Sequence, residues 1–420
     1  MIEFLHTQSG LATLGFLLVG LFTAMVMSNR VPVLAALILT PVLFSLAAGF
    51  GADTGDFAIA GILKLAPVVV MITFAVLYFS LMLDAGLFDP LVRKVVAFTG
   101  DDPMRVTLGT AVLALVIAFS GDGTSTGLVL IAAFLPVYHR LRMDPAVLGA
   151  ITAFAVAVQN LSPWGGPTPR VAAALNVDPA KVFAAVLPSV AAGMVAVLFV
   201  AWMFGKRERR RLAGPAADAF GSGKQGKGLS QDESARRPRM TWWNLLLTLA
   251  LIAGMVTHLL SPVVLFPIAA AIALMINYPD LKSQRERIAV HGDNIASLVL
   301  LFFGAGIFTG ILNGTGMIGA MAELSVGAIP AGLGGALAPI TAAASMPMTY
   351  FMPLDAFYFG AVPVISHTAA SFGITPEQTA AASLMGLPVH ILSPLLPSLY
   401  VFSAILGVER GVAFHLPDPT

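Results

Sequence analysis

The chain alternates long apolar runs with short polar turns, as proteins that cross a membrane several times do. From Val106 to Pro136 the only charged residue is Asp122, and from Val326 to Ile374 the only formal charge is that of Asp355. One helical crossing of a bilayer takes about 20 apolar residues. Simple spans are therefore predicted at residues 11–28, 31–50, 66–83, 181–204, 242–260, 262–277 and 293–311.

Other apolar segments are interrupted, and they predict a less regular fold. Two of them consist of two short apolar arms around a polar turn, which predicts re-entrant hairpins at 104–119 with 126–138 and at 330–344 with 352–366. Two more contain clustered prolines, which break helices, and are predicted to be broken transmembrane helices at 145–175 and 377–406. Glycines after residue 300 predict close helix packing at Gly304, Gly306, Gly310, Gly314 and Gly316. The predicted class is an all-α polytopic membrane protein.

Composition and charge support this class and give the chain an orientation. Hydrophobic residues make up 57% of the chain and charged residues 11%, against about a quarter charged in soluble domains. Residues 206–240 hold ten Lys and Arg against four acids, a net charge of +6. Positive segments stay in the cytoplasm, so a flexible cytoplasmic linker is predicted there, in a multi-pass protein of the inner (plasma) membrane. The same rule assigns a further set to the cytoplasm: Arg30, Arg93, Lys94, Arg140, Arg142, Lys282, Arg285 and Arg287.

The two sides of this linker resemble each other. Residues 158–163 recur as residues 389–394, and Asp122 recurs as Asp355 at a nearly constant offset. Three such matches in the same order, the third being Pro136 with Pro363, argue for a duplicated unit. Because each unit has an odd number of crossings, the repeat is inverted. The predicted domains are a first half at 1–205, the linker at 206–240 and a second half at 241–420.

The tip of the first hairpin carries the first candidate site. Glycines flanking Asp122 leave backbone groups open to a ligand, and hydroxyl groups supply neutral donors and acceptors. An acid within the membrane indicates function by default. The alternative is a tight turn whose Asp caps the next helix, and both roles can coexist. The candidate residues are Ser120, Gly121, Asp122, Gly123, Thr124 and Ser125.

The first broken span carries the second candidate site, in the segment from Asn160 to Arg170. Its prolines and glycines free N–H and C=O groups at two half-helix ends, which attract anions and cations respectively. The alternative is a kink needed only for packing. Trp164 could pack or bind, and Arg170 could clamp a substrate or face the outer interface. The candidate binding residues are Asn160, Gly165, Gly166 and Thr168.

The second half supplies counterparts. The predicted second tip spans residues 345–350 and is followed by Asp355, and the second break spans residues 388–398. His390 is a candidate for proton coupling, although a hydrogen-bonded core histidine is an equally serious interpretation. The candidate residues are Ser345, Thr349, Asp355, His390 and Ser393.

Several of these segments resemble one known family. The chain is similar to the citrate–metal:proton symporter family (CitMHS) of the ion transporter superfamily. The resemblance rests on Gly121–Thr124 with Leu135 and Pro136, on Asn160–Thr168, on Gly310–Met317, on Asp355–Pro363 and on Pro388–Pro394. It implies uptake of citrate complexed with a divalent cation, coupled to protons. The superfamily further implies a homodimer in which a transport domain moves as an elevator against a fixed scaffold.

A metal-bound anion suits the predicted site. If Asp122 and Asp355 converge, unit charges about 4 Å apart interact by about 4 kcal/mol at an effective dielectric of about 20, so bare citrate would be repelled. A hard cation, Mg²⁺ or Ca²⁺, can bridge protein and substrate carboxylates. Alternatively, protons neutralise one or both acids. Asp122 and Asp355 are thus candidate metal contacts, and both, with His390, are candidates for proton coupling; no resident cofactor is expected.

Rival functions are less well supported. An intramembrane aspartyl protease would also use two acids, but Phe119 stands where its Gly-x-Gly-Asp signature needs the first glycine. There is no His-Glu-x-x-His zinc motif, so an enzyme is not expected. A passive channel would share the hairpins but would not saturate. Transport of another di- or tricarboxylate with Na⁺ or H⁺ remains open. A net charge of +1 gives no reason to expect nucleic-acid binding.

Overall fold

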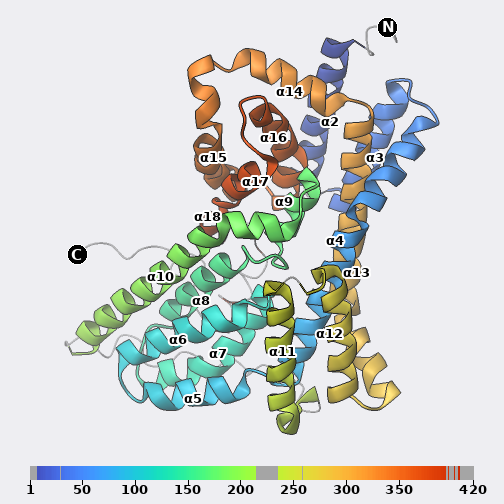
Figure 1. Cartoon of the computed structure of the whole chain (residues 1–420). Coiled ribbons are helices and arrows are strands. Elements are labelled where there is room, and N and C mark those ends of the chain that lie inside the picture. Colours follow the sequence, from blue (N-terminus) through green and yellow to red (C-terminus); the bar gives the residue numbers. More distant parts are fainter. Residues whose placement is uncertain are drawn as a thin grey trace.

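The computed structural model describes residues 7–28, 30–213, 235–257 and 259–393, together with residues 396, 402, 405 and 406. Every regular element within these residues is a helix, so the predicted all-α class is confirmed. Helices α4 (Asp53–Asp84) and α13 (Leu281–Gly314) run side by side along the length of the molecule. A lower group of helices from residues 89–212 and an upper group from residues 317–390 lie beside them (Figure 1).

Several helices have the length and composition of membrane spans. Four described helices pass this test: α2 (Gln8–Met27), α4, α10 (Pro179–Leu212) and α13. Shorter apolar helices add to them: α3 (Val33–Ala47), α6 (Pro103–Ala118), α8 (Pro145–Gln159) and α12 (Pro262–Asn277). The seven predicted simple spans correspond to α2, α3, α4, α10, α11 (Thr241–Val256), α12 and α13, although α4 and α13 both begin earlier than predicted. The chain is therefore a multi-pass membrane protein.

Aspartates set where many of these helices begin. Asp102, Asp144 and Asp178 are the N-caps of α6, α8 and α10, and each accepts a hydrogen bond from a backbone N–H of the first turn. Asp280 does the same for α13. Such caps satisfy donors that the helix itself leaves free. Aspartate side chains thus define the starts of several helices.

Helices α4 and α13 approach each other so closely that glycine is required. A Cβ atom added to Gly61 would collide with the carbonyl oxygen of Gly306 and lie 2.7 Å from the Cα of Gly310. A Cβ atom on Gly310 would in turn lie 2.8 Å from the Cα of Gly61. The predicted close packing at Gly306 and Gly310 is therefore confirmed. With α3 and α12, which also pack on this pair, α4 and α13 form what we call the scaffold helices.

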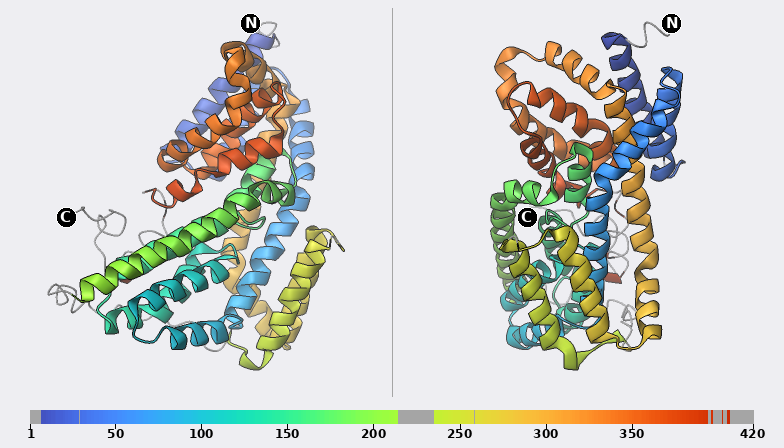
Figure 2. Two further views of the ribbon diagram at one scale, coloured as in Figure 1. Left: turned by 60° about the vertical axis from the view of Figure 1, so that its left-hand side comes forward. Right: turned by 45° about the vertical axis from the view of Figure 1, so that its right-hand side comes forward.

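The lower group contains the first predicted hairpin. Helices α6 and α7 (Gly123–Arg140) pack against each other and are joined by a turn at residues 119–122. The predicted broken span is also confirmed, since α8 ends at Gln159 and α9 (Pro167–Leu175) begins after a non-helical stretch. Figure 2 shows the long helix α10 running diagonally beside them. An amphipathic helix, α5 (Asp89–Thr99), was not predicted.

The upper group differs from prediction in its hairpin. Helix α14 (Met317–Ala328), which was not predicted, leads through a 3₁₀ turn (Ala331–Ala336) into α15 (Leu337–Phe351) at an angle of 111°. Residues 345–350, the predicted tip, are helical, and the chain turns at residues 352–354 instead. A π-helix (Ala356–Ala361) and α16 (Val362–Ala370) follow. The second broken span begins with α17 (Pro376–Leu384) and α18 (Leu387–His390), and most of its predicted residues after 393 lie outside the described ones.

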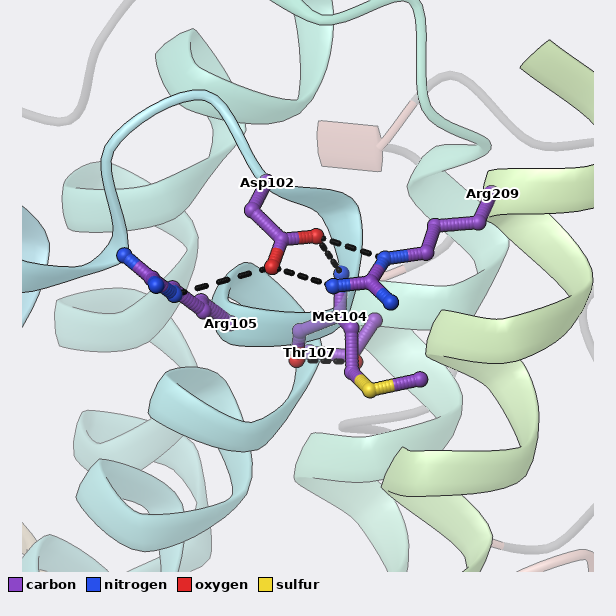
Figure 3. A network of polar contacts seen from close by, with 5 residues as sticks. All are labelled: Asp102, Met104, Arg105, Thr107 and Arg209. Atoms are coloured by element: carbon purple, nitrogen blue, oxygen red, sulfur yellow. Dashed lines mark hydrogen bonds and ion pairs between the residues drawn. The ribbon is translucent and has the colours of Figure 1, made fainter. Parts of the chain in front are cut away.

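The predicted linker also starts later than expected. Helix α10 continues to Leu212, so residues 206–212 are helical, and most of the remainder, residues 214–234, lies outside the described residues. The end of α10 is attached to the base of the first hairpin (Figure 3). There Arg209 donates from Nε and Nη2 to the two carboxylate oxygens of Asp102, at 2.8 and 2.5 Å, and Arg105 lies 3.6 Å from the same carboxylate. Helix α10 and the hairpin are thereby held together.

Candidate functional site

A large cavity lies where the interrupted segments meet. It has a volume of about 970 Å³ and is lined from the first hairpin by Gly121, Gly123 and Thr124. The first break adds Asn160 and Gly166, and the turn after α15 adds Asp355. His390 lines it from the second break. We call it the central cavity. Figure 1 shows α9 and α18, two of the helices that border it, at the junction of the upper and lower groups.

An ion pair connects the two halves of the chain at this cavity. Arg170, on α9, donates from Nε to Oδ1 of Asp355 at 2.8 Å, and the side chains are only 17% and 18% exposed. Its Nη1 donates to the carbonyl of Gly166 at 2.7 Å, which fixes the guanidinium plane. Because both residues line the central cavity, the interpretation that Arg170 faces the outer interface is wrong. Asp355 meets an arginine rather than Asp122.

Asp122 forms the predicted cap at the first tip. Its Oδ1 accepts from the backbone N–H groups of Thr124 and Ser125 at 2.9 and 3.2 Å, and its Oδ2 accepts from the Ser125 hydroxyl at 2.5 Å. Gly121 precedes it with a φ of +81°, a conformation that glycine adopts without strain. These hydrogen bonds therefore hold the Asp122 carboxylate in one orientation.

A second, smaller cavity lies on the other side of this turn. It has a volume of about 160 Å³ and is lined by Ser120, Asp122 and Gly165, and by α4 and α13. Four residues line both cavities: Gly121, Gly123, Gly166 and Arg170. Asp122 and Asp355 thus line adjoining cavities separated by a wall of glycines and one arginine.

Trp164 attaches the first break to the scaffold helices. Its indole N–H donates to the carbonyl of Phe119 at 2.7 Å, and its ring lies 5.4 Å from the rings of Phe79 on α4 and Phe266 on α12. It is 6% exposed. Trp164 therefore packs, although it also borders the smaller cavity. Gly165 beside it cannot carry a side chain, since an added Cβ atom would collide with the carbonyl oxygen of Asn160.

His390 links the second break to α15. Its Nδ1 lies 2.5 Å from the carbonyl oxygen of Thr349, and the side chain is 7% exposed while lining the central cavity. The Ser393 hydroxyl donates to the carbonyl of Tyr350 at 2.7 Å, next to that contact. His390 is therefore a hydrogen-bonded core histidine that also borders the cavity, and its part in proton coupling stays a prediction.

Some predicted binding residues lie behind the cavity walls. The buried hydroxyls of Thr168, Ser345 and Thr349 donate to backbone carbonyls, those of Leu161, Ala342 and Ser345 respectively. Together with Ser393 they line neither cavity. Ser345 and Thr349 bond to the preceding turn of α15, as hydroxyl groups within helices often do. These four residues position the site and do not face it.

Two features of the site were not predicted. Arg30, expected only as a cytoplasmic charge, lines the central cavity. The Ser162 hydroxyl, in the first break, is buried and has no hydrogen-bond partner among the described residues. Its sequence position inside the proline-rich stretch is the signal that could have found it. The described residues contain no cluster of three or more His, Asp or Glu side chains able to hold a metal ion.

Comparisons with known proteins show which family the chain belongs to. Residues 48–386 match the family CitMHS, described as citrate transporter. The citrate transporter of Bacillus subtilis (strain 168) is 47% identical over 96% of this chain and 93% of its own length. The Mg(2+)/citrate complex secondary transporter of the same organism is 44% identical over 95% of this chain and 92% of its own length. Among solved structures, the YdaH transporter of Alcanivorax borkumensis matches with a TM-score of 0.50 and 19% identity, over 96% of this chain and 90% of that one, and shares the fold.

The family match spans most of the chain, and both relatives align over nearly their whole length. The chain therefore belongs to the CitMHS family of citrate transporters.

Proposed function

We propose that this protein is a secondary active transporter of the plasma membrane that takes up citrate as a complex with a divalent cation, by symport with protons. The observation that carries the proposal is the central cavity, in which the Arg170–Asp355 pair stands opposite the glycine-rich tip of the first hairpin. Its volume of about 970 Å³ lies within the range of about 300–1,000 Å³ usual for small-molecule sites.

Arg170 is the group we assign to a citrate carboxylate. Nε and Nη1 are engaged by Asp355 and Gly166, and a guanidinium has further N–H groups in its plane that match a carboxylate. Thr124, Asn160 and the N–H groups near Gly121, Gly123 and Gly166 line the same space. We propose these as donors to the remaining carboxylates and the hydroxyl of citrate, with Ser120, Ser125 and Gly165 supporting the tip from behind.

In this proposal the divalent cation is cargo. Citrate supplies most of its oxygen ligands, and Asp122 and Asp355 contact it or carry the coupled proton, with His390 as a third proton-coupling candidate. The relative whose name states a Mg(2+)/citrate complex supports Mg²⁺ as the first cation to test, with Ca²⁺ beside it. The ion pair supports a role for Asp355, because Arg170 offsets the charge that would otherwise repel the substrate.

The conformational part of the proposal is an elevator. The hairpins and breaks form one transport domain, the scaffold helices stay fixed, and a homodimer provides the support. The halves at 1–205 and 241–420 are proposed as an inverted repeat joined by a cytoplasmic linker. Figure 2 shows the first hairpin in the lower group of helices and the second in the upper group, and an inverted repeat would separate its two hairpins in this way.

Uptake by the purified protein in liposomes tests the function. Labelled citrate is supplied with Mg²⁺, with Ca²⁺, or with EDTA, each with and without an inward proton gradient. We expect accumulation that saturates, needs the divalent cation and follows the proton gradient. Uptake that is unaffected by EDTA would reject the metal complex, accumulation driven by Na⁺ alone would reject proton symport, and flux without saturation would indicate a channel.

A further inference from the structure

A second polar pair joins the scaffold helices below the smaller cavity. His291, on α13, has its Nε2 2.8 Å from Oδ2 of Asp84, at the last position of α4. The side chains are 18% and 23% exposed. Arg287, one turn earlier on α13, lies 3.8 Å from the same oxygen and is 12% exposed. A half-buried imidazole thus shares one carboxylate with a permanent cation.

This pair continues the two helix faces that line the smaller cavity. On α4 the cavity is lined by Ile72, Val76 and Ser80, each four residues after the last, and Asp84 is the next residue in that row. Residues four apart lie on one face of a helix, with a rise of about 6 Å.

Helix α13 repeats this arrangement. Leu298 and Asn294 line the cavity, and His291 is the next residue toward the start of the helix on the same face. Neither member of the pair lines the cavity, but each lies about one turn beyond the last lining residue of its helix, on the same face.

Charged groups lie on both sides of the pair. From the end of the predicted linker, the backbone N–H of Arg237 donates to the carbonyl of Ala85, while its guanidinium contacts the carbonyl of Asn277 and the ring of Tyr278. Arg236 pairs with Asp89 at 3.2 Å. Across the cavity stand Asp122 from α7 and Arg170 from α9. The pair thus lies between the substrate region and the basic end of the protein.

We infer that His291 and Asp84 pass the coupled proton between the smaller cavity and the cytoplasmic end. The inference rests on the proposed proton symport. One nitrogen of a neutral imidazole accepts a proton while the other donates, so the His291 ring accepts a proton from the cavity side and becomes an imidazolium held by the Asp84 carboxylate. Loss of that proton to water at the cytoplasmic end restores the neutral ring. No other atom is transferred, and no other bond changes.

The test separates net transport from exchange. Net uptake needs release of the proton inside, whereas exchange of labelled for unlabelled citrate across the membrane lets the carrier return loaded and protonated. Purified His291→Gln protein in liposomes with citrate and Mg²⁺ should lose net, gradient-driven accumulation by about 10²-fold. Its citrate exchange should stay within about twofold of wild type, since glutamine still hydrogen-bonds to Asp84 and no proton release is needed.

Controls keep the inference distinct from the proposed function. His139→Gln, at the last turn of α7 near the same end, should retain both activities. If wild type itself shows no proton-driven accumulation, the proposed function fails. If wild type accumulates citrate and His291→Gln does so equally, or loses exchange as well, the proton role is rejected. Should His291→Gln fail to fold, Asp84→Asn gives the same comparison with the imidazole in place.

Discussion

Arg170 and Asp355 are 185 residues apart in the chain and form the one described ion pair at the central cavity, with 2.8 Å between Nε and Oδ1. One residue belongs to the helix after the first break and the other to the turn of the second hairpin. The pair therefore couples the two halves at the place where substrate would bind.

Replacing Arg170 should remove transport. Arg170→Gln deletes the carboxylate-binding group, and a hydrogen bond to a charged group contributes about 1.5–3 kcal/mol, so we expect uptake to fall by about 10- to 10²-fold. Arg170→Lys keeps the charge without the planar fork and should recover only part of it. Initial uptake rates over a range of citrate concentrations measure both effects.

A double variant distinguishes binding from simple charge compensation. If Arg170 and Asp355 only neutralise each other, Arg170→Gln with Asp355→Asn should recover transport. If Asp355→Asn alone still transports but the double variant does not, Arg170 binds substrate. The matched control is Arg105→Gln, because Arg105 also lies near an aspartate but is 59% exposed and lines neither cavity. Normal uptake by Arg170→Gln alone would remove this residue from the site.

Asp122→Asn should abolish uptake in a folded protein. Asparagine is as good an N-cap as aspartate, so α7 keeps its start and the stability should change by about 1 kcal/mol or less. What is lost is the negative charge that we assign to the cation or the coupled proton. Uptake in liposomes and thermal unfolding in detergent give the two readouts.

Asp178→Asn is the matched control for this experiment. Like Asp122 on α7, Asp178 is the N-cap of its helix, α10, where it accepts from one backbone N–H. It is exposed, however, and lines neither cavity. It should transport normally. Wild-type uptake by Asp122→Asn would exclude Asp122 from the mechanism.

The first half of the site could be predicted from sequence because its signals are local. A glycine-flanked aspartate after an apolar arm predicts a turn and a cap, and prolines at 163, 167 and 169 predict a break; both are present. The partner of Asp355 could not be predicted, since an ion pair between distant segments depends on how the halves pack. For that reason the sequence did not decide whether Arg170 binds substrate or faces the outer interface.

The second tip was misplaced for a different physical reason. Ser345, Pro347 and Thr349 looked like turn residues, but Pro347 lies inside α15. The two hydroxyls bond back to carbonyls of the preceding turn, and Thr349 also reaches the carbonyl of Gly386 at 3.2 Å. Proline within a membrane helix is tolerated when neighbours satisfy the freed backbone groups. Composition alone cannot reveal such neighbours.

The glycine crossing of α4 and α13 predicts a sharp stability effect. Gly310→Ala puts a methyl group against the backbone of Gly61 and Phe57, and overpacking of this kind costs about 1–3 kcal/mol or more. Gly55→Ala, in the first turn of α4, is the control, because nothing lies within 4 Å of its added Cβ atom. The temperature of unfolding in detergent should fall for Gly310→Ala and not for Gly55→Ala. Equal unfolding temperatures would mean that the helices separate easily at this crossing.

The Asp102–Arg209 pair predicts how stability depends on pH (Figure 3). The hydrogen bonds from Arg209 hold the pKa of the Asp102 carboxyl below its ordinary value. A lowered folded-state pKa contributes stability that is complete above the unfolded value of about 3.9 and is lost as the pH falls through the folded value. Asp102→Asn should therefore unfold at a lower temperature than wild type at pH 7, and this difference in unfolding temperature, the gap, should close below about pH 4.

Salt should narrow the gap between Asp102→Asn and wild type as well, since Arg209 is 49% exposed. Asp101→Asn, whose carboxylate is 79% exposed beside Arg140, should show little gap at any pH. A gap for Asp102→Asn that stayed constant down to about pH 3 would mean that the charge of Asp102 is not its cause, since asparagine keeps the N-cap.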